Sequence, residues 1–175
     1  CTVSGSYTVT GNSTINPTTQ LVHVSCFGGS DGSITVTSAG GTAPHTYSIN
    51  GSIYQNSNVL GGLSAGTYLV AVKDATGCVD FVTRTINQPA VLTVVLDSLR
   101  TSCFGTNTGR IYITASGGNA GKAYAWTGPN GYISTAQDPN NIGAGVYNVI
   151  VTDSKGCTAN LSVTLNQWPM VTVDR

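Results

Sequence analysis

Charged side chains are scarce in this sequence, and glutamate is absent from it. Charged residues make up 8% of the chain, with seven aspartates balanced by seven lysines and arginines. Binding to nucleic acid requires several basic side chains that neutralise phosphates, and binding to anionic membranes requires a polybasic segment. Because the sequence has no basic cluster, we expect neither nucleic acid nor a membrane among its partners.

Long apolar runs are missing as well. No stretch approaches the eighteen or more apolar residues of a membrane helix, and the first residues lack the charged-then-apolar order of a signal peptide. The only methionine is Met170. We therefore interpret the sequence as an excerpt of a longer chain, whose export signals would lie elsewhere in that chain.

Threonine, valine, serine, glycine, asparagine and tyrosine dominate instead. These residues favour strands and tight turns, whereas few of the long straight side chains that stabilise helices are present. Apolar residues reach 40% of the chain, and they alternate with polar ones over short stretches such as 68–73 and 161–165. A period of two residues is typical of half-buried antiparallel strands.

The sequence contains an internal repeat. The motif Cys26-Phe27-Gly28 recurs as Cys103-Phe104-Gly105, 77 positions later. Because the second copy is slightly longer, Cys78 recurs as Cys157, 79 positions later. Matching tyrosines are expected to point into the core of each copy: Tyr47, Tyr68, Tyr124 and Tyr147.

Each copy reads as about seven short antiparallel strands with glycine-rich turns and no helix. The predicted fold class is therefore all-β, as tandem immunoglobulin-like β-sandwich repeats that each have their own core. We assign two repeats to residues 21–90 and 91–170, the tail strand of a truncated preceding repeat to residues 1–20, and the start of a next repeat to residues 171–175.

Two predicted hairpins begin with aspartate. The segments 74–77 and 153–156 place Asp first and Gly fourth, which is the order of a type I turn. A calcium site is the alternative, but one carboxylate per turn falls far short of the six to eight oxygen ligands that calcium takes. We interpret both as turns in which the aspartate accepts hydrogen bonds from its own backbone.

The cysteines predict disulfides. In an up-and-down count of strands, the loop after the first strand and the hairpin before the last strand lie at the same end of the sandwich. This count pairs Cys26 with Cys78 and Cys103 with Cys157, and it leaves Cys1 without a partner in the chain. Each bridge would contribute on the order of 4 kcal/mol by the chain-entropy estimate. Disulfides predict an oxidising, extracytoplasmic location.

Metal binding and catalysis are not expected. The cysteines form no C-x-x-C motif, and His23, three positions before Cys26, has no second Cys/His pair to complete a set of metal ligands. His23 and His45 have no counterparts in the second copy, where Arg100 and Lys122 stand. Without glutamate, the chain also lacks a carboxylate pair of the kind that glycosidases use. We predict no cofactor, no metal and no enzymatic activity.

The repeat resembles the SprB repeat of very large surface proteins of Bacteroidetes. The resemblance rests on the cysteine–glycine opening, the paired glycines, the Ala-Gly-x-Tyr strand start and the Asp-x-x-Gly-Cys hairpin, which are the segments Cys26–Ile34, Gly40–Pro44, Leu63–Tyr68 and Val72–Cys78. It implies export by the type IX route, display on the outer cell surface, and a part in adhesion or gliding. Two departures are Pro44-His45, where the family has Pro-Tyr, and Ile49, where it has a strand Trp that the second copy retains as Trp126.

The leading hypothesis is a structural stalk or filament repeat of a surface adhesin, whose partners are neighbouring repeats. A carbohydrate-binding module that holds surface polysaccharide is one alternative, since exposed aromatic rings could stack on sugars: Tyr54, Trp126, Tyr132 and Trp168. Another is a self-assembling fibre subunit that uses residues 1–20 for strand addition.

Two further expectations concern the boundaries between copies. Residues 89–96 and 169–173 are expected to run directly into the first strand of the next copy, so that the copies are joined end to end, and Trp168 is expected to lie between neighbouring copies. Asp97-Ser98-Leu99 fits a short sequon for O-glycosylation in exported Bacteroidetes proteins, which predicts a glycan on an exposed Ser98.

Overall fold

The computed structural model describes residues 14–172, which form two compact units. The first unit comprises residues 14–24 and Gly29–Asn87, and the second comprises Ser25–Gly28 and residues 88–172. The four residues Ser25–Gly28 thus belong to the second unit, although in sequence they fall between two strands of the first.

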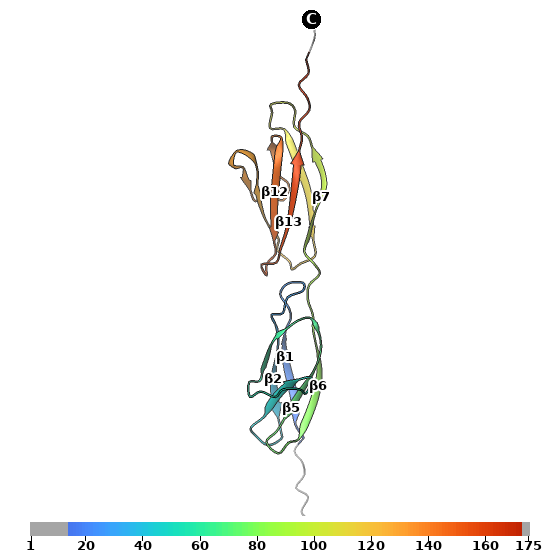
Figure 1. Ribbon diagram of the computed structural model, residues 1–175, viewed down its shortest axis with the longest axis vertical. Coiled ribbons are helices and arrows are strands. Elements are labelled where there is room, and N and C mark those ends of the chain that lie inside the picture. Colours follow the sequence, from blue (N-terminus) through green and yellow to red (C-terminus); the bar gives the residue numbers. More distant parts are fainter. Residues whose placement is uncertain (1–13, 173–175) are drawn as a thin grey trace, which may run out of the picture. The chain divides into compact units, whose positions relative to one another are not determined.

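The described part of the first unit has two three-stranded antiparallel sheets (Figure 1). Their orders are β1-β2-β4 and β3-β5-β6. The strands are β1 (Asn16–Val22), β2 (Gly32–Ala39), β3 (Thr46–Ile49), β4 (Val59–Leu63), β5 (Gly66–Lys73) and β6 (Val79–Ile86).

The second unit repeats this plan with one additional strand. Its sheets have the orders β11-β8-β7 and β10-β9-β12-β13. The strands are β7 (Thr93–Arg100), β8 (Gly109–Ser116), β9 (Ala123–Thr127), β10 (Ile133–Ser134), β11 (Asn140–Ile142), β12 (Gly145–Thr152) and β13 (Thr158–Leu165), and a 3-10 turn, η1 (Pro129–Gly131), precedes β10.

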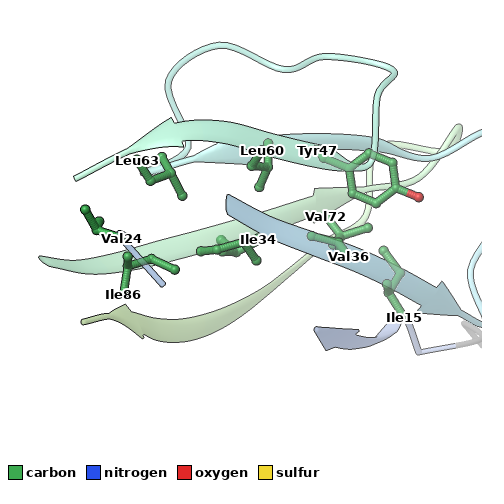
Figure 2. Packing of buried hydrophobic residues seen from close by; sticks show 10 residues of the cluster. Ile15, Val24, Ile34, Val36, Tyr47, Leu60, Leu63, Val72 and Ile86 are labelled. Atoms are coloured by element: carbon green, nitrogen blue, oxygen red, sulfur yellow. The ribbon is translucent and has the colours of Figure 1, made fainter. Parts of the chain in front are cut away.

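Each unit buries a core of its own between its two sheets. In β2 and β8 the apolar residues alternate with polar ones, so that Ile34 and Val36, like Ile111 and Ile113, all point inward and are fully buried. Figure 2 shows the first core, where residues of both sheets face one another. Burial of these side chains is the main stabilising contribution to such small units.

The matching tyrosines contact these cores, as predicted. Tyr47 and Tyr147 are buried, while Tyr68 and Tyr124 are partly buried against the two clusters. Tyr147 donates its hydroxyl hydrogen to the carbonyl oxygen of Gly143 (3.0 Å), and Tyr68 makes the equivalent bond. Each ring therefore packs apolar surface while its polar end is satisfied.

The observed architecture confirms the all-β, antiparallel, immunoglobulin-like class. The boundary expected after residue 20 differs, because that position lies inside β1, whose residues pair with β2 from Asn16↔Ala39 to Val22↔Ser33. The segment 16–20 is thus an edge strand of the first unit and is already hydrogen-bonded there. The rest of the predicted tail, residues 1–13, lies outside the described residues, as do residues 173–175.

In the described range, no helix is long and apolar enough to cross a membrane.

Candidate functional site

The hairpin between β12 and β13 is the centre of the candidate site. Asp153 Oδ1 accepts hydrogen bonds from the backbone N–H groups of Lys155 (2.9 Å) and Cys157 (3.0 Å), and the Gly156 N–H closes the turn on the Asp153 carbonyl oxygen (3.0 Å). The aspartate therefore shapes its own turn, as predicted, and fixes the position of Cys157 at the start of β13.

The other oxygen of Asp153 holds a second loop against the hairpin. Asp153 Oδ2 accepts the backbone N–H of Asn119 (2.7 Å) and the Nδ2 group of the same residue (2.9 Å). Asn119 follows a pair of glycines, and a Cβ on the first, Gly117, would lie 1.8 Å from the Val91 carbonyl oxygen. Glycine is required there both for that close approach and for its φ of +70°.

These hydrogen bonds favour the charged carboxylate. They lower the pKa of Asp153 from 3.8 to about 2, with the Asn119 backbone N–H as the largest cause. Asp74 has the same arrangement in the first unit, where the Thr42 N–H and the Thr76 hydroxyl lower its pKa to about 2. Both hairpins are thus tied by an ionised aspartate at neutral pH.

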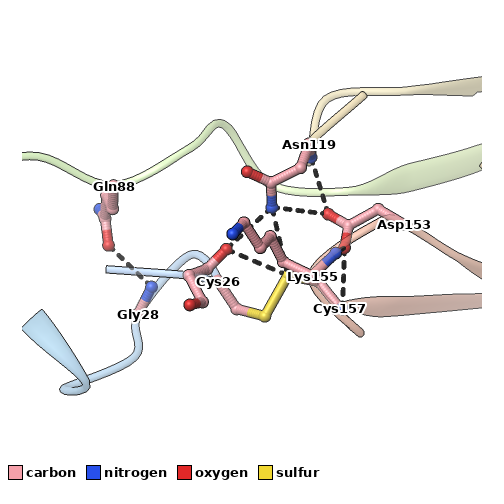
Figure 3. The surroundings of a disulfide bond; sticks show 8 residues. Cys26, Gly28, Gln88, Asn119, Asp153, Lys155 and Cys157 are labelled. Atoms are coloured by element: carbon pink, nitrogen blue, oxygen red, sulfur yellow. Dashed lines mark hydrogen bonds between the residues drawn. A yellow bond between two sulfur atoms is a disulfide. The ribbon is translucent and has the colours of Figure 1, made fainter. Parts of the chain in front are cut away.

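Residues Ser25–Gly28 lie against this hairpin (Figure 3). The carbonyl oxygen of Ser25 accepts a hydrogen bond from Asn119 Nδ2 (2.8 Å) and lies 3.3 Å from the Cys157 sulfur. A hollow of about 340 Å³ beside the loop is lined by Cys26, Phe27, Val91, Leu92, Gly156, Cys157 and Thr158. The loop thus has polar contacts to the hairpin region and apolar residues around the hollow beside it.

A disulfide joins Cys26 to Cys157, with their Cα atoms 5.6 Å apart. The bond lies entirely within the second unit, and it fixes the loop 25–28 covalently to the β12–β13 hairpin. Since it carries no proton, the Cys157 sulfur makes a van der Waals contact with the Ser25 oxygen and donates no hydrogen bond to it.

This pairing corrects both predicted bridges, because each of them requires one of these two sulfurs. In the first unit the Val24 N–H bonds the Asn87 carbonyl oxygen (3.0 Å), which places the Cys26 loop beside the end of β6. Cys78 lies before the start of β6, and eight extended residues separate the two ends by roughly 20 Å. A disulfide needs Cα atoms only about 4.4–6.8 Å apart.

The strand count gave the wrong pairing because it left out one reversal of chain direction, which residues 50–58 make. After β3, residues 50–58 bring the chain back along that strand, with Tyr47 bridged to Gln55 in antiparallel fashion. β4 then runs in the same direction as β3, since β4 pairs antiparallel with β2 and β3 with β5. The hairpin before β6 consequently lies at the opposite end from the β1–β2 loop.

The other three cysteines, Cys1, Cys78 and Cys103, are not part of this disulfide. Cys103 is exposed and forms no disulfide with any residue in the range 14–172. Cys78 is half-buried in the first hairpin, where its backbone N–H bonds Asp74 Oδ1 (2.9 Å). Cys1, predicted to lack a partner within the chain, lies outside the described residues.

Sequence reasoning missed the role of Asn119. Its amide connects Ser25, Asp153 and the disulfide sulfur, yet no motif marks it. A comparison of the two copies could have identified it. Asn119 and Thr42 both follow the paired glycines, but only asparagine carries an amide.

The aromatic residues expected for a sugar platform do not form one. Trp126 is 1% exposed and donates its indole N–H to the Ala136 carbonyl oxygen (2.9 Å). Tyr132 packs edge-on against Tyr147, with ring centroids 5.4 Å apart, and the Lys73 ammonium lies over the Tyr54 ring. Trp168 is 64% exposed, and no aromatic partner for it occurs among residues 14–172.

A polar hollow of about 560 Å³ lies in the second unit near Tyr132. Several amide side chains and glycines line it, together with the edge-on pair Tyr132 and Tyr147. Its lining includes Asn107, Asn130, Asn141 and Gln167. Such groups can hydrogen-bond a neutral polar ligand, but the hollow contains no charged side chain.

The other predicted residues are exposed or engaged with the backbone. Ser98 is exposed on β7, and the Asp97 carboxylate beside it accepts the Thr114 hydroxyl hydrogen (2.7 Å). His45 Nε2 lies 3.0 Å from the Gly40 carbonyl oxygen, and His23 Nδ1 accepts the Asn87 N–H (3.1 Å). Within residues 14–172, no three His, Cys, Asp or Glu side chains come together as metal ligands would.

Comparison with known proteins gives one family and several structures. The chain is similar to a C-terminal fragment of intimin in complex with the intimin-binding domain of the translocated intimin receptor, at 15% identity and a TM-score of 0.43, over 87% of this chain and 64% of that one. It is also similar to Dscam, at 16% identity and a TM-score of 0.37, over 89% and 46%. The chain therefore spans less than two thirds of either structure, and no curated protein matches it.

The family match falls on both copies of the repeat. The model of the SprB repeat matches residues 18–52 and residues 101–131, which contain the two Cys-Phe-Gly loops and the strands that follow them. The resemblance seen in the sequence is thereby confirmed over two segments, each of which matches the SprB repeat.

Proposed function

We propose that this chain is a stalk section of a large bacterial surface adhesin, in which successive repeats give length and mechanical strength. The observation that carries the proposal is that the chain contains two similar units. Two segments match the SprB repeat, and the chain has two units, each with its own core and its own aspartate-tied hairpin. A chain built of such units can be lengthened by adding copies without changing any core.

An extracellular location on the outer cell surface belongs to the same proposal. The Cys26–Cys157 disulfide requires an oxidising compartment to persist. A surface with 8% charged residues relies on hydroxyl and amide groups for its hydration, as the many exposed threonines and serines provide. Export by the type IX route and a part in gliding rest on the family resemblance alone.

The same features argue for a chain without enzymatic activity. The polar side chains of the candidate site are satisfied by one another: Asp153 accepts four hydrogen bonds and the cysteines are oxidised. A catalytic group needs a free lone pair or proton directed at a substrate. The hairpin instead resembles a structural joint.

Replacement of the segment in its parent protein tests the stalk. We would exchange this segment for an unrelated pair of immunoglobulin-like units of similar length, and follow display with an antibody to a distal part of the protein. A stalk predicts unchanged display and unchanged adhesion or gliding. Unchanged display with loss of adhesion would show that the segment itself binds a ligand, and would refute the proposal.

Carbohydrate binding is the second candidate, and the amide-lined hollow beside Tyr132 is the observation that favours it. Amides and a tyrosine edge suit the hydroxyl groups of a neutral polysaccharide. Binding of the intact chain to a glycan array, lost on Tyr132→Ala or Asn107→Ala but kept in Ile133→Ala as an exposed control, would support this function. Absence of any glycan signal would refute carbohydrate binding, and the stalk would remain as the proposed function.

Glycosylation of Ser98 stays a proposal of its own. The residue is exposed on β7, as an O-linked glycan requires, and a hydrated sugar would limit edge-to-edge contacts of a weakly charged sheet. Mass spectrometry of the protein from its native source should find the peptide around Ser98 heavier by a glycan. A Ser98 peptide of unmodified mass would refute it.

A further inference from the structure

The two copies carry the same Cys-Phe-Gly loop with the same local support. The Gly28 N–H donates to the Gln88 side-chain oxygen (2.7 Å), and the Gly105 N–H donates to the equivalent Gln167 oxygen (3.4 Å). Both glycines have a positive φ, +75° and +70°. The two loops therefore share a glycine at positive φ and a hydrogen bond to a glutamine side chain.

Only the first of these loops has its binding surface within the described chain. Residues 25–28 are held by the Asn119 amide and by the disulfide to Cys157, beside a hollow that Val91 and Leu92 also line. In the second loop Cys103 is exposed and forms no disulfide within residues 14–172. The phenyl ring that follows is exposed alike in both loops, 55% for Phe27 and 51% for Phe104, so the free thiol is what distinguishes the second loop.

The surface that binds residues 25–28 is built from repeated parts. Its elements are an Asp-x-x-Gly-Cys hairpin and a glycine pair whose following N–H bonds the aspartate. The first unit has the same arrangement, in which the Thr42 N–H bonds Asp74 Oδ2 (3.0 Å). A copy of the repeat thus offers a loop and, separately, a surface for the loop of another copy.

We propose that the Cys103-Phe104-Gly105 loop binds this surface on a further copy of the repeat and forms a disulfide with the cysteine of its hairpin. The proposal deepens the stalk function and rests on it, since it makes each pair of successive repeats covalently joined outside the main chain. It goes beyond Cys26–Cys157 by assigning a partner to Cys103. The partner is identified by its chemistry as a second SprB-type hairpin with a free thiol.

The bond forms by thiol–disulfide exchange with a small disulfide oxidant such as oxidised glutathione. The Cys103 thiolate attacks one sulfur of the oxidant and releases one reduced thiol; the hairpin thiolate then attacks Cys103 and releases the second. Two protein thiols lose two electrons and two protons in total, and the oxidant gains them. No other redox partner is required.

The backbone at the second loop leaves the necessary acceptor available. The Ser102 carbonyl oxygen, equivalent to that of Ser25, accepts the Trp168 N–H (2.9 Å). A carbonyl oxygen has two lone pairs, so it can accept a further amide N–H in the way Ser25 accepts Asn119. The Trp168 N–H therefore occupies one of the two lone pairs.

A lengthened chain tests the proposal without dependence on protein concentration. The complete chain would be followed directly by a second copy of residues 97–175, which continues the 79-residue register of the sequence. In this copy Cys103 is replaced by serine, and Thr158→Ser gives its hairpin peptide a mass different from that of the native Cys157 peptide. After refolding with reduced and oxidised glutathione, remaining thiols are alkylated and peptides are mapped without reduction. We expect two bonds, Cys26–Cys157 and Cys103 to the hairpin cysteine of the appended copy.

Variants test separately the formation of the new disulfide and the docking of the loop. Cys103→Ser should leave the appended hairpin cysteine alkylated while Cys26–Cys157 persists. Asn119→Ala in the appended copy should slow formation of the new bond several-fold, because it removes the amide that holds Ser25 in the first loop. Asn148→Ala in the same copy, which removes an exposed amide from β12, should not. An alkylated Cys103, its bonding to Cys1 or Cys78, or equal rates for the two alanine variants would overturn the proposal.

The mapping also distinguishes this inference from the stalk itself. It reports the cysteine partners in purified protein, whatever the parent protein does on the cell. Loss of adhesion when the segment is replaced in cells, together with the expected peptide map, would refute the stalk function. The disulfide assignment would still stand.

Discussion

Asp153 illustrates how much a single side chain contributes at the residue scale. Its pKa lies near 2 in the folded chain, against 3.8 ordinarily, because backbone N–H groups favour the charged form. A lowered pKa stabilises the folded state at pH values above 3.8, and this contribution is lost as the pH falls through about 2. We therefore expect the thermal midpoint of the second unit to fall steeply between pH 4 and pH 2.

The variant Asp153→Asn should have a lower midpoint at neutral pH and a flatter profile between pH 4 and pH 2, since no carboxylate titrates at that position. Circular dichroism melts at several pH values would measure both effects. Asp97→Asn is the control, because Asp97 is exposed and accepts one hydrogen bond, from Thr114. An unchanged pH profile in Asp153→Asn would contradict the assigned role.

At the scale of elements, the disulfide joins a loop to a hairpin that are 131 residues apart in sequence. Such a long closed loop restricts the unfolded chain strongly, so Cys26→Ser should lower the free energy of unfolding of the second unit by about 2–5 kcal/mol. Urea denaturation of the oxidised protein measures this loss. Cys103→Ser should leave the stability of this chain unchanged, and equal stability of Cys26→Ser and wild type would contradict the pairing.

The elements also show where local sequence is informative. The alternating stretch 68–73 predicted β5 within two residues, because alternating apolar residues and Asp-to-Gly turns are local signals. The direction of β4 was not predictable in this way. It depends on how residues 50–58 return beside β3, and their sequence carries no periodic pattern.

At the scale of the whole molecule, the chain has two cores that share no residue. Ile34 is fully buried in the first, and its truncation to alanine should cost about 2–5 kcal/mol. Calorimetry should then resolve two transitions, of which only the one belonging to the first unit shifts downward in Ile34→Ala.

The matched control for this experiment is Ile53→Ala, since Ile53 is 83% exposed in the same unit. Its melting profile should equal that of the wild type. A single transition that shifts as a whole in Ile34→Ala would mean that the two units unfold together, and would contradict independent cores.

The sequence by itself determined the repeat, the all-β class, the aspartate turns and the inward tyrosines. These features depend on residues near one another in the chain or on matches between copies. It also indicated oxidised cysteines, but it did not determine their partners.

Only the tertiary structure decided that Cys26 bonds Cys157 and that Asn119 holds the Ser25 carbonyl. The physical reason is geometric. Disulfide partners must bring their Cα atoms within about 7 Å, and which loops meet depends on the direction of every intervening strand. One returning segment reverses the end at which a hairpin lies, and so changes the partner of each cysteine.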